Sequence, residues 1–187
     1  MGKIKETLSR FILHISGWKV ICTIPDLNKC VICVAPHTSN WDFIWGKLAY
    51  LSIGRFAGFL IKKDWFFFPF NRIFSSMGGI PVDRSRKTDL VEQIAQQYKT
   101  HERFSVAITP EATRKRNPNW KMGFYYIALK AEVPIVLAYL DYGKKEIGLT
   151  RIFYPTGNEE ADLKEIKAFY RDKRGRFPER FAIELRN

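Results

Sequence analysis

The chain has 187 residues, of which 46% are hydrophobic, 15% aromatic and 27% charged. This length and composition are typical of one globular domain with a substantial core, and they exclude an intrinsically disordered chain. The formal net charge of +12 indicates anionic partners, and because no zinc-finger spacing or RNA-recognition signature is present, an anionic membrane surface or a phosphorylated substrate is favoured over nucleic acid.

An amphipathic helix is predicted within residues 1–16. Apolar side chains recur there at helical spacing, namely Ile4, Leu8, Phe11, Ile12 and Ile15. Such a helix either lies in a membrane interface or packs on the domain. No segment approaches the roughly 18 uninterrupted apolar residues of a membrane-spanning helix, and the N-terminus lacks the features of a signal peptide. Together with the positive charge, this leads us to expect a peripheral protein at the cytoplasmic face of a membrane.

Two strands are predicted next, at residues 18–24 and 30–35, with a turn at residues 25–28 between them. The three cysteines, Cys22, Cys30 and Cys33, lie in these apolar runs and are odd in number. We interpret them as buried free thiols in a reducing compartment. The spacing of Cys30 and Cys33 is that of a dithiol pair, but no second pair exists, so no metal or redox site is expected.

The turn after the second strand carries the chain's most informative residues. Pro36 ends the strand, His37 follows, and Asp42 comes five residues after the histidine. Ser39 and Asp42 have the spacing of a helix N-terminus, so a helix is predicted from about residue 39 to residue 53. A carboxylate in the first helical turn can orient the imidazole of His37 and leave it free as a general base. The alternative is that Asp42 only caps the helix and that His37 is a loop residue.

A strand is predicted at residues 56–61, followed by an aromatic segment at residues 62–70, which begins with two lysines. This segment is either a core helix or a contact with an acyl chain or membrane, with its lysines at headgroup level. Gly78 and Gly79 permit a close approach of the backbone, and a short strand after them delivers Arg84 at its end.

A helix at residues 87–101 and a buried strand at residues 104–108 come next. The strand runs directly into a loop at residues 109–116 that carries four charged side chains. Ligands of open α/β sheets bind at the carboxyl ends of strands, where this loop is expected to lie. The alternative is a solvated basic loop without a ligand.

The remaining elements are a helix at residues 121–131, strands at residues 133–139 and 147–153, and a charged helix at residues 158–173. Residues 177–187 receive no role. The alternation of strands and helices predicts an α/β fold with a mainly parallel central sheet flanked by helices. We expect a single domain over residues 1–187.

Four blocks of this sequence occur in a fixed order. They are His37 with Asp42, Gly-Gly-Ile-Pro-Val-Asp-Arg at residues 78–84, Pro-Glu-Ala-Thr-Arg at residues 110–114, and Val-Pro-Ile-Val at residues 133–136. Together they resemble the glycerolipid acyltransferase family, of the 1-acylglycerol-3-phosphate acyltransferase (PlsC) type. The match spans a motif-bearing core at residues 30–140, and the segment at residues 62–69 resembles the stretch that the family carries between its first two blocks. The resemblance implies the glycerol-3-phosphate acyltransferase-like fold.

The resemblance also implies a reaction and its partners. A fatty acyl group would pass from an acyl thioester, either acyl-CoA or acyl-acyl carrier protein, to the hydroxyl of a lysophosphatidic acid-like glycerolipid in phospholipid biosynthesis. His37 would take the hydroxyl proton, and Asp42 would hold the imidazole ring. The expected partners are this donor, the phosphorylated acceptor, an anionic membrane surface and acyl carrier protein. No cofactor, metal or nucleic acid is expected.

The family's other blocks imply substrate-binding residues. Arg84 and Arg114 would hold the acceptor phosphate, because a guanidinium can grip phosphate oxygens through two hydrogen bonds. Glu111 would orient these arginines or bind acceptor hydroxyls. Thr113 and Lys63, which belong to the matching segments, are further expected substrate-binding residues.

One position departs from the family pattern, which usually has glycine where this chain has Ala112. If the position needs positive φ, alanine costs roughly 1 kcal/mol there. This difference keeps other acceptors open, namely glycerol 3-phosphate, another lysophospholipid or a lipoamino acid. A thioesterase with the same His–Asp pair and a non-catalytic basic membrane-binding module are the remaining alternatives.

Overall fold

The computed structural model describes residues 2–82 and 87–184, and its strands form a single seven-stranded sheet. The strands are β1 (Lys19–Cys22), β2 (Lys29–Ala35), β3 (Gly58–Lys62), β4 (Gly79–Val82), β5 (Phe104–Ile108), β6 (Ile135–Asp141) and β7 (Glu146–Phe153). Their order across the sheet is β1-β7-β6-β2-β5-β3-β4. Every neighbouring pair is parallel except β6 with β7. The predicted mainly parallel α/β fold is confirmed.

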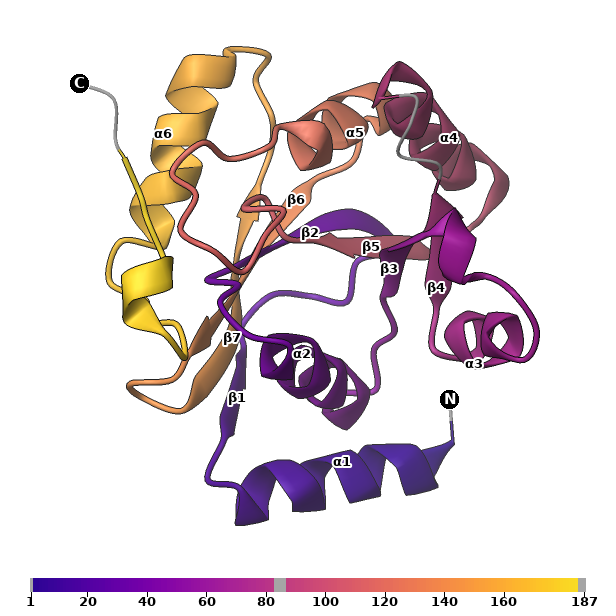
Figure 1. The fold of residues 1–187 in the computed structure, drawn as a ribbon, viewed down its shortest axis with the longest axis vertical. Coiled ribbons are helices and arrows are strands. Elements are labelled where there is room, and N and C mark those ends of the chain that lie inside the picture. The colour runs from indigo at the N-terminus through magenta and orange to yellow at the C-terminus, as the bar shows by residue number, and fades with distance from the viewer. Residues whose placement is uncertain (1, 83–86, 185–187) are drawn as a thin grey trace.

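Helices cover both faces of this sheet. They are α1 (Lys3–Ile15), α2 (Trp41–Ser52), α3 (Phe70–Ser76), α4 (Lys87–Thr100), α5 (Gly123–Ala131) and α6 (Glu159–Phe169), with 3-10 turns at Lys63–Trp65 and Pro178–Arg180. In Figure 1, α2 and α1 lie below the sheet, and α4 and α5 lie above it. The single helix predicted over residues 158–173 ends earlier, at Phe169, after which Tyr170 turns into the core.

The central strands are apolar on both faces because each face is covered by helices. On β2, Val31 and Cys33 pack in the core formed with α4, α5 and α6, whereas Ile32 packs in a second cluster that includes Tyr50 of α2. This alternation follows the two-residue period of a strand. All three cysteines are free thiols, and Cys30 and Cys33 are buried as predicted, whereas Cys22 is only half-buried.

Helix α1 packs on α2 through a face that the sequence did not indicate. Ser9 and Leu13 are buried there, and Leu13 belongs to the same cluster as Ala49 of α2. Of the five apolar residues that predicted the helix, Ile12 is half-buried and four remain exposed, namely Ile4, Leu8, Phe11 and Ile15. Within the described ranges, no helix combines the length and apolar character needed to cross a membrane.

The aromatic segment after β3 is not a core helix, so that interpretation was wrong. It forms the 3-10 turn Lys63–Trp65 and then α3. Phe67, Phe68 and Phe70 are 55%, 72% and 43% exposed, because this part of the chain extends beyond the sheet edge instead of covering a face. The segment thus leaves a row of aromatic side chains in contact with solvent.

Candidate active site

Three neighbouring parallel strands deliver polar side chains to one edge of the sheet. His37 follows the end of β2, Glu111 follows the end of β5, and Tyr142 follows the end of β6. Because parallel neighbours end at the same edge, these residues meet there although they are far apart in sequence. The carboxyl edge of β6-β2-β5 is therefore the expected position of a site.

His37 and Asp42 form a close pair at this edge. The Nδ1 atom of His37 lies 3.3 Å from Oδ2 of Asp42, whose residue is only 4% exposed. The same Oδ2 accepts the backbone N–H groups of Thr38 at 2.7 Å and Ser39 at 2.8 Å. Since Nδ1 faces the carboxylate, Nε2 is the ring nitrogen left for chemistry in the adjoining cavity.

Asp42 contacts both the start of α2 and the imidazole of His37, so it does not only cap the helix. Asp42 closes a reciprocal cap at the start of α2, because its carboxylate accepts the N–H of Ser39 while Ser39 Oγ accepts the N–H of Trp41 at 3.2 Å. The cap fixes the carboxylate in the place where it also meets His37. One side chain thus starts the helix and orients the imidazole.

Glu111 has a different position from the one expected. Its side chain is fully buried, and Oε1 accepts the backbone N–H of His37 at 2.6 Å. Oε2 has no hydrogen-bond partner among the described residues. Burial raises the pKa of Glu111 to about 8, the hydrogen bond from His37 opposes this rise, and the charge of Asp42 adds to it. Glu111 therefore supports the backbone of His37 from inside the protein, where it does not face the cavity.

The loop after β5 brings the other expected residues to the cavity. Thr113 and Arg114 line it, and the exposed guanidinium of Arg114 donates to Oδ1 of Asn40 beside the start of α2. Ala112 has φ of +55°, the left-handed conformation that favours glycine. Lys63 is exposed and does not line the cavity. Arg84 lies outside the described residues.

The cavity next to His37 has a volume of about 980 Å³ and is lined from both faces of the sheet, by α2 on one face and by α4 and α5 on the other. Its mouth is polar, and its interior is apolar, lined among others by Ile32, Val34, Phe43, Leu60, Ala138 and Leu149. Lys47 of α2 also belongs to this lining. Lys47 donates to the carbonyl of Ala57 at 3.2 Å, and burial lowers its pKa to about 8. Sequence reasoning missed Lys47, because a lysine within a helix usually faces solvent.

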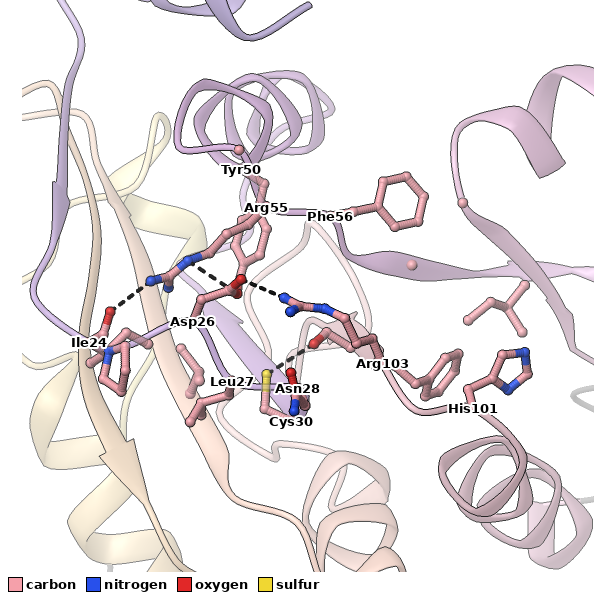
Figure 2. A pocket seen from close by; sticks show the side chains of 18 of the residues that line it. Ile24, Asp26, Leu27, Asn28, Cys30, Tyr50, Arg55, Phe56, His101 and Arg103 are labelled. Atoms are coloured by element: carbon pink, nitrogen blue, oxygen red, sulfur yellow. Dashed lines mark hydrogen bonds and ion pairs between the residues drawn. The ribbon is translucent and has the colours of Figure 1, made fainter. Parts of the chain in front are cut away.

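A second cavity, of about 620 Å³, lies at the opposite edge of the sheet, where the strands begin (Figure 2). Figure 2 shows Arg55 and Arg103 both directed at Asp26. The Nε atom of Arg55 is 3.4 Å from Oδ1, and Nη2 of Arg103 is 2.5 Å from Oδ2. The carboxylate thus offsets part of the positive charge of this cavity.

The two cavities follow one another along the same face of the sheet. On β2, Cys30 lines the second cavity and Ile32 lines the active-site cavity, and on β6 Val136 and Ala138 are divided in the same way. Tyr50, near the end of α2, lines both. The residue therefore lies at the boundary between an apolar chamber and a more polar one.

The site contains no recognisable metal centre. Over residues 2–82 and 87–184, no cluster of three or more His, Cys, Asp or Glu side chains is placed to hold a metal ion. What the arrangement offers is an oriented imidazole at the mouth of an apolar cavity, with Arg114 beside it. This combination suits proton transfer from a hydroxyl on a molecule that has both an apolar and an anionic part.

Comparisons with known proteins agree with this geometry. No curated protein sequence matches the chain closely enough to be counted as a relative. Among solved structures, the 1-acyl-sn-glycerophosphate (LPA) acyltransferase PlsC from Thermotoga maritima is similar, with a TM-score of 0.59 and 19% identity over 89% of this chain and 75% of that chain. At this identity the likeness establishes the fold. The acyltransferase family model matches residues 13–140, and the chain therefore belongs to the acyltransferase family.

Proposed function

We propose that this acyltransferase moves a fatty acyl group from an acyl thioester to the hydroxyl of a lysophosphatidic acid-like glycerolipid, as a step of phospholipid biosynthesis. The observation that carries the proposal is the His37–Asp42 pair at the mouth of the apolar cavity. A reaction that joins an alcohol to a long acyl chain needs a base and an apolar chamber in contact, and this site has both.

The chemistry follows from the orientation of the imidazole. Nε2 of His37 takes the proton of the acceptor hydroxyl as its oxygen attacks the thioester carbonyl carbon. Asp42 holds the ring and stabilises the imidazolium that forms. When the tetrahedral intermediate collapses, the carbon–sulfur bond breaks and the leaving thiolate takes the proton from the imidazolium. The protein ends in its starting state, so the reaction requires no cofactor and no covalent enzyme intermediate.

The cavity interior would hold the acyl chain. Ile32 and His37 are five residue steps apart, which span about 17 Å at about 3.3 Å per residue of extended chain. Carbon–carbon bonds of about 1.5 Å advance an extended chain by about 1.3 Å each, so this length accommodates roughly 13 carbons. Tyr50, which lines both this cavity and the second one, would form the floor of the chamber. A matching chain would reach the floor with its carbonyl carbon beside His37.

The acceptor phosphate would bind at the polar mouth. Arg114 and Thr113 line the cavity there, and a guanidinium can give a phosphate two parallel hydrogen bonds. We keep Arg84 as a second phosphate ligand on the basis of its sequence block. Lys63, exposed after β3, would contribute positive charge to the same edge of the sheet rather than a direct contact in the cavity.

We also propose that the protein docks on an anionic membrane at the cytoplasmic face. The exposed apolar side chains of α1 and the exposed phenylalanines near α3 support this, because monomeric proteins seldom expose such groups without a partner. Both elements lie on the lower side of the molecule in Figure 1, the side of α2. The formal net charge of +12 complements anionic lipid. A lipid acceptor would then reach the cavity from the bilayer.

A product assay tests the proposed reaction. Purified protein is incubated with labelled acyl-CoA, or with labelled acyl-acyl carrier protein, and with lysophosphatidic acid, glycerol 3-phosphate, an uncharged monoacylglycerol or no acceptor. We expect labelled phosphatidic acid with the first acceptor. Release of free fatty acid alone would indicate a thioesterase, and label only in another product would assign another acceptor.

A matched pair of variants locates the phosphate site in the same assay. Arg114→Ala should raise the KM for the phosphorylated acceptor and leave the KM for the donor unchanged. Arg116→Ala removes an equal charge from an exposed residue of the same loop that does not line the cavity. It should leave both values near those of the wild type. Equal effects of the two variants would argue against a phosphate contact at Arg114.

A further inference from the structure

Two segments beyond the residues that match the family model reach the turn that carries His37 and Asp42. The first is the connection between β6 and β7, where the hydroxyl of Tyr142 donates to Oδ1 of Asp42 at 2.7 Å. The second is the segment after α6, where the N–H of Phe177 donates to Oγ1 of Thr38 at 3.2 Å. The family match ends at residue 140, so neither contact belongs to its blocks.

These two segments are also joined to each other. The N–H of Tyr142 donates to the carbonyl of Arg174 at 2.8 Å. Gly175 lies so close to Thr38 that an added Cβ would be 2.8 Å from its Oγ1 and Cγ2 atoms. A side chain at this position would therefore push the second segment away from the turn. The turn at residues 37–42 is thus held by two segments that are distant in sequence, and we call these two segments the clamp.

The hydrogen bonds of Asp42 show what the clamp does. Oδ2 accepts the N–H groups of Thr38 and Ser39 and faces Nδ1 of His37. Oδ1 accepts the hydroxyl of Tyr142. Without that hydroxyl, Oδ1 would be a buried carboxylate oxygen lacking its donor, which is costly. Oδ2 would then be held only by the N–H groups of Thr38 and Ser39, so the carboxylate would stay beside the imidazole but would be less firmly oriented.

The ring of Tyr142 is itself held in place. Trp18 packs edge-on against it with ring centroids 4.9 Å apart, and Trp18 also packs on Trp45 of α2 at 5.5 Å. Burial and the hydrogen bond to Asp42 raise the pKa of the Tyr142 hydroxyl, so it stays protonated and remains a donor over the range in which the enzyme works. Its position and its protonation are thus both fixed.

We propose that Tyr142 is a positioning residue of this acyltransferase, which holds the carboxylate of Asp42 so that Oδ2 orients His37, and that the segment at residues 174–177 holds Tyr142 and Thr38 for that purpose. The role rests on the proposed function, since it needs His37 to act as a base. It assigns Tyr142 no contact with substrate.

The role has an electrostatic consequence. The hydroxyl draws part of the negative charge of the carboxylate to Oδ1, so its loss concentrates charge on Oδ2 beside the ring and favours the imidazolium. Among the described residues, the other ionisable groups near the pair include Glu111 and Arg114, from the loop after β5, and Arg176, from the segment after α6. A phenylalanine at position 142 changes none of them. The acid limb of the pH–rate profile should therefore move to higher pH in Tyr142→Phe.

The test compares Tyr142→Phe with Tyr98→Phe by steady-state kinetics over pH 5–9. Tyr98 is also buried, and its hydroxyl donates to the carbonyl of Cys30, at the other end of β2. We expect about a tenfold lower kcat for Tyr142→Phe, unchanged KM values and the shifted acid limb. Tyr98→Phe should lose stability without moving the limb. If Tyr142→Phe keeps the wild-type kcat and acid limb, or if both variants change only stability, the proposal is overturned.

A second readout separates this proposal from the proposed function. The chain has three histidines, so the imidazole resonances of His37 can be assigned and followed by NMR as pH changes. In Tyr142→Phe they should titrate at a higher pH than in the wild type, whether or not the correct acceptor is known. Identical NMR titrations in the two proteins would refute the role of Tyr142. Absence of transfer to every acceptor, with shifted titrations, would refute only the proposed reaction.

Discussion

The buried carboxyl of Glu111 predicts an unusual dependence of stability on pH. The residue is fully buried, and only one of its oxygens has a partner among the described residues, the N–H of His37 at 2.6 Å. Burial raises the pKa of Glu111 from 4.5 to about 8. Between these values the folded protein holds a proton that the unfolded chain has released. The free energy of unfolding should therefore fall as pH rises through this window.

The size of the effect follows from the number of protons involved. One proton gives a slope of about 1.4 kcal/mol per pH unit, so the contribution present below pH 4.5 is lost by about pH 8 and amounts to about 4 kcal/mol between pH 5 and pH 8. Glu111→Gln keeps an oxygen acceptor for the N–H of His37 and has no proton to lose. Relative to the wild type, this variant should become more stable with increasing pH by about that amount.

Urea denaturation at pH 5, 6, 7 and 8 measures the difference, because groups common to both proteins cancel when the two curves are subtracted. Glu165→Gln is the control, since it makes the same change on an exposed residue that pairs with Arg151, and surface pairs contribute little. Its difference from the wild type should vary by less than about 1 kcal/mol over the range. A flat difference for Glu111→Gln would mean that the carboxyl is ionised in the folded protein, and the reasoning would fail.

Three other predictions concern the backbone, the cavity and the membrane. Ala112→Gly should raise the free energy of unfolding by about 1 kcal/mol, because Ala112 has φ of +55°. The control Ala168→Gly, in α6, should lower the free energy of unfolding. If both variants are destabilised, the backbone at Ala112 is not strained. Tyr50→Ala should move the preferred acyl length above about 13 carbons, as measured with acyl-CoA of graded length, whereas Tyr50→Phe should leave it unchanged; equal preferences in all three proteins would show that Tyr50 is not the floor. Leu8→Glu should weaken co-sedimentation with anionic vesicles far more than Gln96→Glu, which adds the same charge on α4; equal binding of the two variants would argue against α1 as the docking element.

The strands and helices were largely predictable, because the spacing of apolar residues over a few positions indicates each of them. Residues 30–35 are uniformly apolar since both faces of β2 are covered, and such runs alternate along the chain with amphipathic segments. The pairing of His37 with Asp42 was predictable for a similar reason. Both belong to one strand–turn–helix unit, and the cap that starts α2 places the carboxylate.

The remaining parts of the site depend on contacts that local sequence does not encode. Tyr142 lies 100 residues from Asp42, and Phe177 lies 139 residues from Thr38. Only the order of strands in the sheet brings them together. One signal was available in hindsight, because Tyr142 follows β6 as His37 follows β2, and parallel neighbours end at the same edge.

The direction in which individual side chains point was the other feature that the sequence did not predict. The charged loop at residues 109–116 was correctly expected near a cavity, yet Glu111 points into the protein while Arg114 points out. The direction of the Glu111 side chain depends on the space beside β5 and on the N–H of His37, which donates to its carboxylate. Composition likewise could not distinguish a buried from an exposed aromatic segment at residues 62–70, since both are apolar.

The rate of acyl transfer by His37→Ala, with the labelled acyl thioester and the best acceptor of the wild type, tests the central claim most directly. A positioned general base accelerates such a reaction about 10²- to 10⁴-fold, so we expect kcat to fall by at least about 100-fold in a variant whose circular dichroism and unfolding curve match those of the wild type. A folded His37→Ala protein that retains a turnover close to that of the wild type would contradict the assignment of His37 as the base.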